Sequence, residues 1–179
     1  MTSSGLFNDG PPQNATPTTI VRPATVEDLP RMASLAAQLV RMHHDLDPAR
    51  FFVARGVEDG YRAWFGRELA EARAVLLVAD RGDDLVVGYA YGRMEPRDWN
   101  MLLDRHAALH DVLVEQGSRG HGVAEALLEA FVERVRAAGA PRVVLHTAIR
   151  NERAQALFKR LGFRPTMLEM TRELEPGVP

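Results

Sequence analysis

The stretch from residue 108 to residue 135 limits the possible folds of this chain more than any other. It begins with the apolar run "ALHDVLV", passes through the glycine-rich loop "EQGSRGHG", and continues with apolar residues that recur every three or four positions. The run predicts a buried strand, and the recurring pattern predicts an amphipathic helix. The sequence therefore predicts a strand that leads through a glycine loop directly into a helix.

The remaining segments predict more strands and helices around this unit. Strands and helices alternate in the second half, which is typical of an α/β sandwich around a mixed sheet. A chain of 179 residues fits one domain, which we expect over 17–179, after a mobile polar tail at 1–16. The expected strands are 19–22, 74–80, 85–94, 108–114, 142–147 and 166–174, and the expected helices begin at Thr25 and cover 58–71, 123–135 and 151–162.

The composition excludes several classes of function. The formal net charge is −2, whereas nucleic-acid and membrane-surface binding usually need a clustered positive field. The chain has no cysteine, so thiolate sites are excluded, and its histidines show no metal-ligand spacing. No segment approaches the roughly 18 apolar residues of a membrane span. We therefore expect a cytoplasmic protein without a metal.

The loop after residue 114 has the features of a phosphate-binding loop. Gly117, Gly120 and Gly122 permit sharp turns, and Arg119 adds a cation. The helix that follows offers unpaired N–H groups and partial positive charge at its start. The loop lacks the Gly-Lys-Ser/Thr ending of a Walker A loop, and Glu125 stands where the Rossmann fingerprint requires glycine. A glycine turn without a ligand stays open as the alternative.

Two motifs resemble those of the GNAT superfamily of acyl-CoA N-acyltransferases. "RGHGVA", residues 119–124, is similar to the family signature Arg/Gln-x-x-Gly-x-Gly/Ala, and "NERAQALFKRLGFRP", residues 151–165, is similar to its second motif. The order of elements from about Thr19 to Leu174 also fits. The resemblance implies an α/β (α+β) fold with a mixed, mostly antiparallel sheet. This sheet would splay between the strands "DVLV" and "VVLHT" and carry helices on both faces.

The resemblance further implies acetyl-CoA as the acyl donor. Backbone groups of residues 112–114 would bind the pantetheine arm, and N–H groups of residues 120–125 would bind the pyrophosphate. Asn151 would lie near the cofactor, although asparagine at a helix start is also a common cap. The cofactor-binding residues implied in this way are Val112, Leu113, Val114, Arg119, Gly120, His121, Gly122, Val123, Ala124, Glu125, Asn151, Ala154 and Phe158.

Acyl transfer to an amine needs a base, because most alkyl amines are protonated at neutral pH. His110 is the leading candidate, since an imidazole with a pKa of about 6.5 can accept a proton at pH 7. The resemblance to arylalkylamine acetyltransferases also favours a histidine at this place. Asp111 would point to the opposite face of a regular strand, and only a bulge would bring both side chains to the site. A core histidine without a catalytic role is the alternative.

The general acid is the point where the sequence departs from the family. Phe158 occupies the position at which the family usually has tyrosine, and phenylalanine has no proton to donate. Tyr91 is the candidate substitute, with a core role as its alternative. A thiolate is already a fairly good leaving group, so a slower reaction without a side-chain acid is also consistent with the sequence.

We therefore expect an N-acetyltransferase that moves an acetyl group to a primary amine of a small molecule by direct transfer in a ternary complex. The alternatives are a degenerate acyl-CoA-binding regulatory domain and a protein or peptide N-acetyltransferase. Residues 41–47, 88–100 and the end of the chain are expected around the acceptor. Glu95 and Asp98 could attract a cationic amine, although arginines flank both. A homodimer is one expectation for the oligomeric state.

Overall fold

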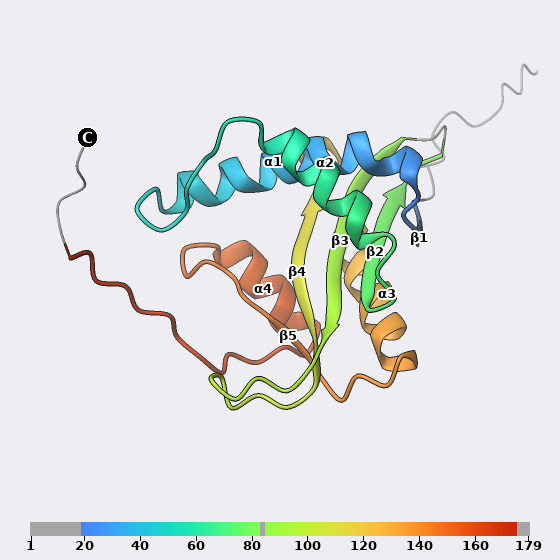
Figure 1. The fold of residues 1–179 in the computed structure, drawn as a ribbon. Helices are drawn as coiled ribbons and strands as arrows, with labels where there is room; N and C mark the ends of the chain where they lie inside the picture. Colours follow the sequence, from blue (N-terminus) through green and yellow to red (C-terminus); the bar gives the residue numbers. More distant parts are fainter. Residues whose placement is uncertain (1–18, 83–84, 175–179) are drawn as a thin grey trace, which may run out of the picture.

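A five-stranded sheet forms the centre of the molecule in the computed structural model, which describes residues 19–82 and 85–174 (Figure 1). The expected tail at 1–16 lies outside the described residues. The strands are β1 (Ile20–Pro23), β2 (Ala74–Asp80), β3 (Val86–Glu95), β4 (His106–Val114) and β5 (Val143–Leu145), and they lie in this order across the sheet. The pairs from β1 to β4 are antiparallel, and β5 joins β4 in parallel. The expected mixed sheet is therefore confirmed.

Helices cover both faces of the sheet, as expected (Figure 1). One face packs against α1 (Leu29–Leu46) and α2 (Val57–Glu68), and the other packs against α3 (Val123–Ala137) and α4 (Glu152–Arg160). Two short 3₁₀ turns, Val26–Asp28 and Gln116–Ser118, precede α1 and α3. Among the described residues no helix is long and apolar enough to cross a membrane.

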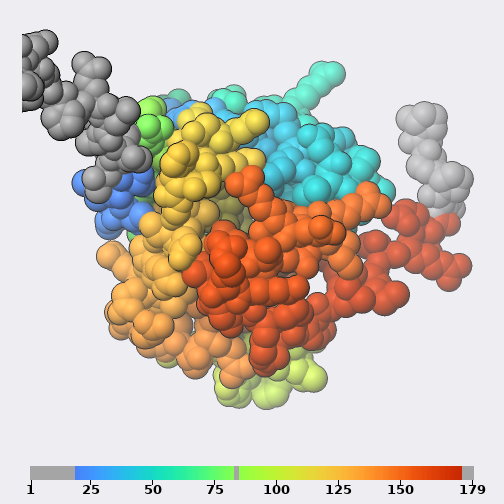
Figure 2. Space-filling view, turned by 180° about the vertical axis from the view of Figure 1, so that it is seen from behind, coloured from blue at the N-terminus to red at the C-terminus, as the bar shows by residue number. Residues whose placement is uncertain are grey.

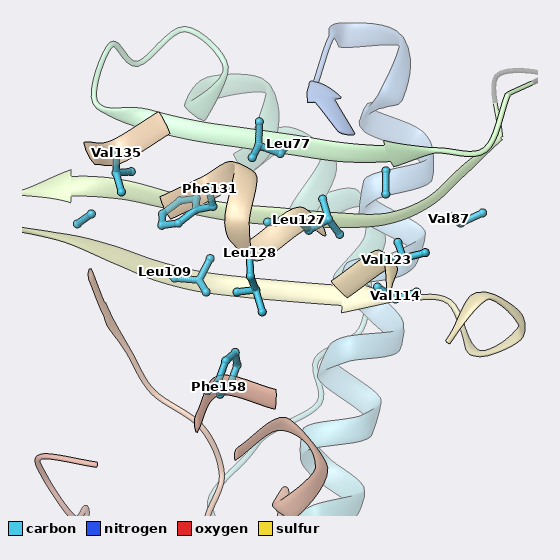
Figure 3. Close-up of a cluster of buried hydrophobic side chains, with 13 residues drawn as sticks. Leu77, Val87, Leu109, Val114, Val123, Leu127, Leu128, Phe131, Val135 and Phe158 are labelled. Atoms are coloured by element: carbon cyan, nitrogen blue, oxygen red, sulfur yellow. The ribbon is translucent and has the colours of Figure 1, made fainter. Parts of the chain in front are cut away.

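Close approach between α3 and the sheet depends on a glycine in β3. A Cβ atom added to Gly92 would lie 2.5 Å from the ring of Phe131 and 2.3 Å from the carbonyl oxygen of Ala108. Both distances are far below van der Waals contact, so any side chain at this position would displace the helix. Figure 3 shows Phe131 pointing from α3 onto the sheet, within a buried cluster that also includes Leu109 and Leu128.

The register between β3 and β4 breaks at one place. Tyr91 pairs with Asp111, but the next residue, Gly92, pairs with Leu109, which leaves His110 as an extra residue in β4. Such a β-bulge changes the direction of the side chains around it. The bulge that would bring His110 and Asp111 to one side of the sheet is therefore present.

The strands β4 and β5 separate after a short pairing. The last pair between them is Leu109 with Leu145, so the part of β4 from His110 to Val114 has no partner in β5. This is the expected splay between "DVLV" and "VVLHT". The pairing is shorter than the sequence predicts, since β5 contains only Val143–Leu145 rather than residues 142–147.

The expected strand at 166–174 is wrong. The described residues there form no strand, and Met167, Leu168, Met170 and Leu174 are 65–87% exposed. Figure 1 shows this segment running away from the sheet. An alternating polar and apolar pattern predicts a strand only where a neighbouring edge takes up its hydrogen bonds, and the pattern alone cannot show whether that edge is reached. Glu169 forms an ion pair with Arg50, which joins this segment to the loop after α1.

Candidate active site

The opening between β4 and β5 exposes one edge of a strand whose other edge is fully paired. Val112 and Val114 lie opposite Ala90 and Gly88 of β3, while the β5 side of this part of β4 is free of strand pairing. A free strand edge presents N–H and C=O groups that can pair with an extended ligand. Part of this edge is already used, because Arg119 donates from Nε to the carbonyl oxygen of Val114 at 2.9 Å.

The loop that follows β4 turns through two glycines in the left-handed region. Gly120 has φ +84° and Gly122, the N-cap of α3, has φ +77°. Side chains rarely adopt this conformation, so the backbone geometry itself favours glycine here. A Cβ atom at either position would meet no described atom within 4 Å. The expected need for glycine is therefore met at Gly120 and Gly122, because of the dihedral angle rather than crowding within the protein, but Gly117 has no positive φ.

The two glycines lead directly into the start of α3, since Gly122 is the N-cap of that helix. The first backbone N–H groups of a helix have no partner within the helix, and the helix dipole places partial positive charge beside them. Glycines allow a bulky anion to approach this backbone closely. The loop at residues 120–125 can therefore accept an anion.

A cavity of about 450 Å³ adjoins the same loop. Its walls come from the second half of α1 and from the loop itself, and they are Gln38, Arg41, Met42, Asp45, Leu46, Gln116 and Arg119. Figure 2 shows the segment after β4 in yellow meeting α1 in cyan and the residues around 150 in orange at this surface. The guanidinium of Arg119 is thus both a support for β4 and part of a cavity wall.

Residues of the second motif occupy the start and the middle of α4. Asn151 caps the helix, since its side chain accepts a hydrogen bond from the backbone N–H of Ala154 at 3.2 Å. The capping alternative for Asn151 is therefore realised in the structure. Phe158 is 7% exposed and lies edge-on to Phe163, with 5.9 Å between the ring centroids. Figure 3 shows Phe158 pointing toward Leu109 of β4.

The bulge in β4 places two titratable side chains next to each other on the α1–α2 face. His110 stacks on Tyr91, with 5.4 Å between the ring centroids, and Asp111 accepts a hydrogen bond from the hydroxyl of Tyr89 at 3.2 Å. Both tyrosines belong to the buried cluster beneath α1 and α2. Both candidate bases therefore lie at the point where β4 leaves β5, as only a bulge allows.

The surroundings of these two groups shift their pKa values in opposite directions. Burial lowers the pKa of His110 below 6.5, because it disfavours the charged imidazolium, and the nearby Glu95 carboxylate opposes that effect. Burial raises the pKa of Asp111 to about 6, against the stabilising hydrogen bond from Tyr89. Both groups are consequently in their proton-accepting forms at pH 7 and above.

The hydroxyl of Tyr91 is already engaged. It donates to Oε2 of Glu68 at 2.8 Å, and both residues are almost fully buried. Burial raises the pKa of Tyr91, and the hydrogen bond to Glu68 adds to this effect. The tyrosine that the sequence offers as a general acid thus holds its proton firmly and directs it toward α2.

Sequence reasoning missed a charged cluster behind His110. Glu68 at the end of α2 accepts hydrogen bonds from Tyr91 and, at 3.3 Å, from Arg93, and Arg93 in turn lies beside Glu95. A glutamate at the end of an amphipathic helix predicts a solvated charge, yet Glu68 is only 7% exposed. The alternation of charged residues along β3 was the available signal, since Arg93 and Glu95 share a face with Tyr91.

The described residues thus combine an open strand edge, a glycine loop at a helix start and two proton acceptors within one stretch of chain. An extended ligand with a pyrophosphate group fits the first two features. The acceptors can deprotonate a nucleophile near the free edge, at the place where the ligand would end. This arrangement suits transfer of a group from a nucleotide-linked carrier.

Comparisons with known proteins agree with this geometry. The model of the "Acetyltransferase (GNAT) family" matches residues 39–163. An L-methionine sulfoximine/L-methionine sulfone acetyltransferase of Pseudomonas aeruginosa is 34% identical over 104 residues, which are 57% of this chain and 57% of that protein. The chain therefore aligns with little more than half the length of this curated relative.

Solved structures show the same fold. A mutant of a Bacillus halodurans protein superposes with a TM-score of 0.76 at 21% identity, over 87% of this chain and 99% of that one. A predicted acetyltransferase of Clostridium acetobutylicum, solved with acetyl-CoA, gives a TM-score of 0.66 at 18% identity, over 86% of this chain and 96% of that one. Members of this family use acetyl-CoA as the acyl donor.

The family match includes the bulged strand, the glycine loop and the second motif up to residue 163, and it extends over more than half of the chain. The fold of residues 19–82 and 85–174, with a mixed five-stranded sheet and four helices, agrees with it. The chain therefore belongs to the "Acetyltransferase (GNAT) family".

Proposed function

We propose that this enzyme transfers the acetyl group of acetyl-CoA directly to a primary amine of a small molecule within a ternary complex. One observation carries this proposal: the bulge in β4 brings His110 and Asp111 to one face where β4 separates from β5. A base at that point lies next to the strand edge that would hold the thioester. The amine can then be deprotonated and can attack without a covalent enzyme intermediate.

His110 is the general base in this proposal. Its pKa is lowered by burial, so the imidazole is neutral at pH 7, and it is 40% exposed and open to an incoming amine. The imidazole takes one proton from the ammonium form of the amine and releases it to solvent. The neutral amine nitrogen then attacks the thioester carbonyl, the C–S bond breaks with the thiolate as leaving group, and the nitrogen loses its second proton to the imidazole. Asp111 lies beside it as a carboxylate that attracts the protonated amine before deprotonation.

The donor would lie along the free edge of β4. The backbone groups of Val112 and the N–H of Val114 would pair with the pantetheine arm, with Leu113 between them bonded to β3. Arg119 together with the N–H groups of Gly120 to Glu125 would hold the pyrophosphate. Asn151 keeps α4 in place as its cap, so that Ala154 and Phe158 would form an apolar wall beside the pantetheine. The position of these residues around the opening between β4 and β5 supports each of these roles.

The leaving thiolate departs without a side-chain acid in this proposal. Phe158 carries no proton, and the hydroxyl of Tyr91 is bonded to Glu68 rather than directed at the opening. Solvent can protonate the thiolate after the C–S bond breaks, since a thiolate is a good leaving group compared with an amine or alkoxide.

A small amino-acid analogue is the first acceptor to test. The relatives from Pseudomonas are acetyltransferases for L-methionine sulfoximine and L-methionine sulfone. A panel of these compounds, other amino acids, polyamines, arylalkylamines and a peptide amine should be incubated with acetyl-CoA while the released thiol is measured. Turnover with a small amine supports the proposal, and turnover with the peptide alone favours a protein acceptor.

A regulatory domain that binds acyl-CoA without turnover is the second candidate, and Phe158 favours it. The same assay separates the two. Tight binding of acetyl-CoA without thiol release from any amine of the panel would support the regulatory function.

A further inference from the structure

A row of alternating charges leads from the buried end of α2 to the imidazole of His110. Arg93 lies between two carboxylates, with its NH1 group 3.3 Å from Oε1 of Glu68 and its Nε 3.3 Å from Oε1 of Glu95. The same Oε1 atom of Glu95 lies 3.8 Å from Nε2 of His110. One carboxylate oxygen is therefore shared between a guanidinium and the candidate base.

Glu95 does not form a hydrogen bond with either Arg93 or His110. Nε of Arg93 is buried and has no hydrogen-bond partner among the described residues, although Glu95 is within ion-pair distance. The distance from Glu95 to His110 is also too long for a hydrogen bond. The side chain of Glu95 is 29% exposed, so it has room to rotate toward either neighbour. Glu95 thus lies between the unpaired Nε–H of Arg93 and the imidazole of His110. Its carboxylate can therefore turn toward His110 when the imidazole becomes charged.

We propose that Glu95 is a positioning residue for His110. Its carboxylate faces Nε2, holds the proton of the neutral ring on that nitrogen and leaves Nδ1 to accept the proton of the amine. When Nδ1 takes that proton, the ring becomes an imidazolium and Glu95 stabilises the positive charge without itself becoming protonated. This inference rests on the proposed role of His110 as the base.

The charged groups around His110 determine the direction in which loss of Glu95 shifts the pKa of the imidazole. Glu95 and Glu68 favour the imidazolium, whereas Arg93 and His146 disfavour it, and burial disfavours it most. Tyr91 covers one face of the ring. Loss of the Glu95 charge removes a favourable partner of the imidazolium, so the pKa of His110 must fall further. A carboxylate that only supported the strand would leave this titration unchanged.

The test uses Glu95→Gln, which keeps the size of the side chain and a carbonyl oxygen. The ¹⁵N and ¹³C signals of the His110 ring, followed by NMR over pH 4–8 without substrate, report its pKa and its tautomer. We expect the Nε2–H tautomer in the unsubstituted protein and a titration at lower pH in Glu95→Gln. Added salt should reduce the difference, because it screens a part-exposed pair. Glu133→Gln, which removes an exposed glutamate on α3, is the matched control.

Kinetics supply the second readout. For Glu95→Gln we expect the acid limb of kcat/KM to move to lower pH with the NMR titration. At neutral pH we expect kcat to fall by at least about tenfold, while KM for the amine is nearly unchanged. The fall should stay smaller than the ~10⁴-fold loss that follows when the carboxylate of a buried catalytic triad is altered. A raised KM with an unchanged His110 titration would instead make Glu95 an acceptor-binding residue and overturn the inference. A ring protonated on Nδ1 would overturn it as well.

The role of His110 as the base and the role of Glu95 as its positioning residue can be tested independently. If His110→Ala keeps full activity, the proposed base is wrong even where the titration shows coupling to Glu95. If His110→Ala is inactive but the pKa of His110 is the same in the parent protein and in Glu95→Gln, only the positioning role of Glu95 is wrong. Melting temperatures of all variants identify any loss of folding, and the NMR titration requires only folded protein.

Discussion

Arg119 donates a hydrogen bond from Nε to the carbonyl oxygen of Val114, across the turn that joins β4 to the glycine loop. The bond fixes the guanidinium beside both the strand edge and the cavity next to α1. A cation held in this way can meet a pyrophosphate without losing the freedom of a long side chain at the moment of binding. A contact within the protein thus prepares the loop for the pyrophosphate that we propose it binds.

Replacing Arg119 should therefore weaken the binding of the acyl donor more than it lowers the stability of the fold. We expect Arg119→Ala to reduce the affinity for acetyl-CoA by about 10- to 100-fold, the range for loss of a charged hydrogen bond, in isothermal titration calorimetry. Arg105→Ala is the control, since Arg105 also donates to a backbone carbonyl, that of Gly139. Equal affinity in the Arg119 variant and the control would remove Arg119 from the donor site.

Gly122 tests the space in front of the loop. Because that space is open among the described residues, the indole of Gly122→Trp can occupy it, and we expect binding of acetyl-CoA to be abolished. The positive φ of Gly122 adds a cost of about 1–2 kcal/mol for any side chain. Gly122→Ala carries this strain without the bulk, so its melting temperature should match that of the Trp variant while it still binds. Calorimetry that finds undiminished binding in Gly122→Trp would contradict the assignment of the loop.

The pH dependence of the reaction separates the two candidate bases. If His110 is the base, His110→Ala should lower kcat/KM by about 10²–10⁴-fold. In the parent enzyme kcat/KM should fall as pH drops through the pKa of His110, which lies below 6.5. This limb should disappear in the variant. A limb that persists near pH 6 would identify Asp111 as the base, because burial raises its pKa to about 6.

The sequence was sufficient for the features that depend on local pattern. The hairpin of β2 and β3 and the helix after the glycine loop follow from apolar periodicity, and the structure has each of them. The position of the bulge at His110 was not predictable, because an extra residue in a strand shows only against the register of its neighbour. The sequence could only state what a bulge would achieve.

Features that depend on long-range packing were beyond the sequence. The burial of Glu68 requires the end of α2 to lie over Tyr91 and Arg93, which are more than 20 residues away. The missing strand at 166–174 depends on the free edge of β5, a strand of three residues. Neither juxtaposition is encoded in a local pattern, so neither the charged cluster nor the exposed C-terminal segment could be foreseen.

Asp111 should also affect stability in a pH-dependent way. Its pKa is raised from 3.8 to about 6 in the folded protein, so the folded state binds the proton more tightly than the unfolded state does. Stability therefore falls as pH rises from about 4 to about 6 and is lowest, with respect to this group, above pH 6. Asp111→Asn removes the titration, and we expect it to be more stable than the parent at pH 7 by about 1–3 kcal/mol. Urea unfolding at pH 4.5 and 7 measures the difference, and an equal effect at both values would refute it.

Phe158 provides the last prediction, because it replaces the tyrosine that the family usually has. The ring is 7% exposed and packs in the apolar cluster with Leu109 and Leu128. In Phe158→Tyr the added hydroxyl would need a partner that this cluster does not offer, at a cost of about 1–3 kcal/mol. We therefore expect a lower melting temperature and no gain in kcat. Faster thiol release at an unchanged melting temperature would show instead that position 158 faces the leaving sulfur and that the missing hydroxyl limits the enzyme. Phe158→Leu separates packing from chemistry, since it changes the shape of the side chain without adding a proton donor.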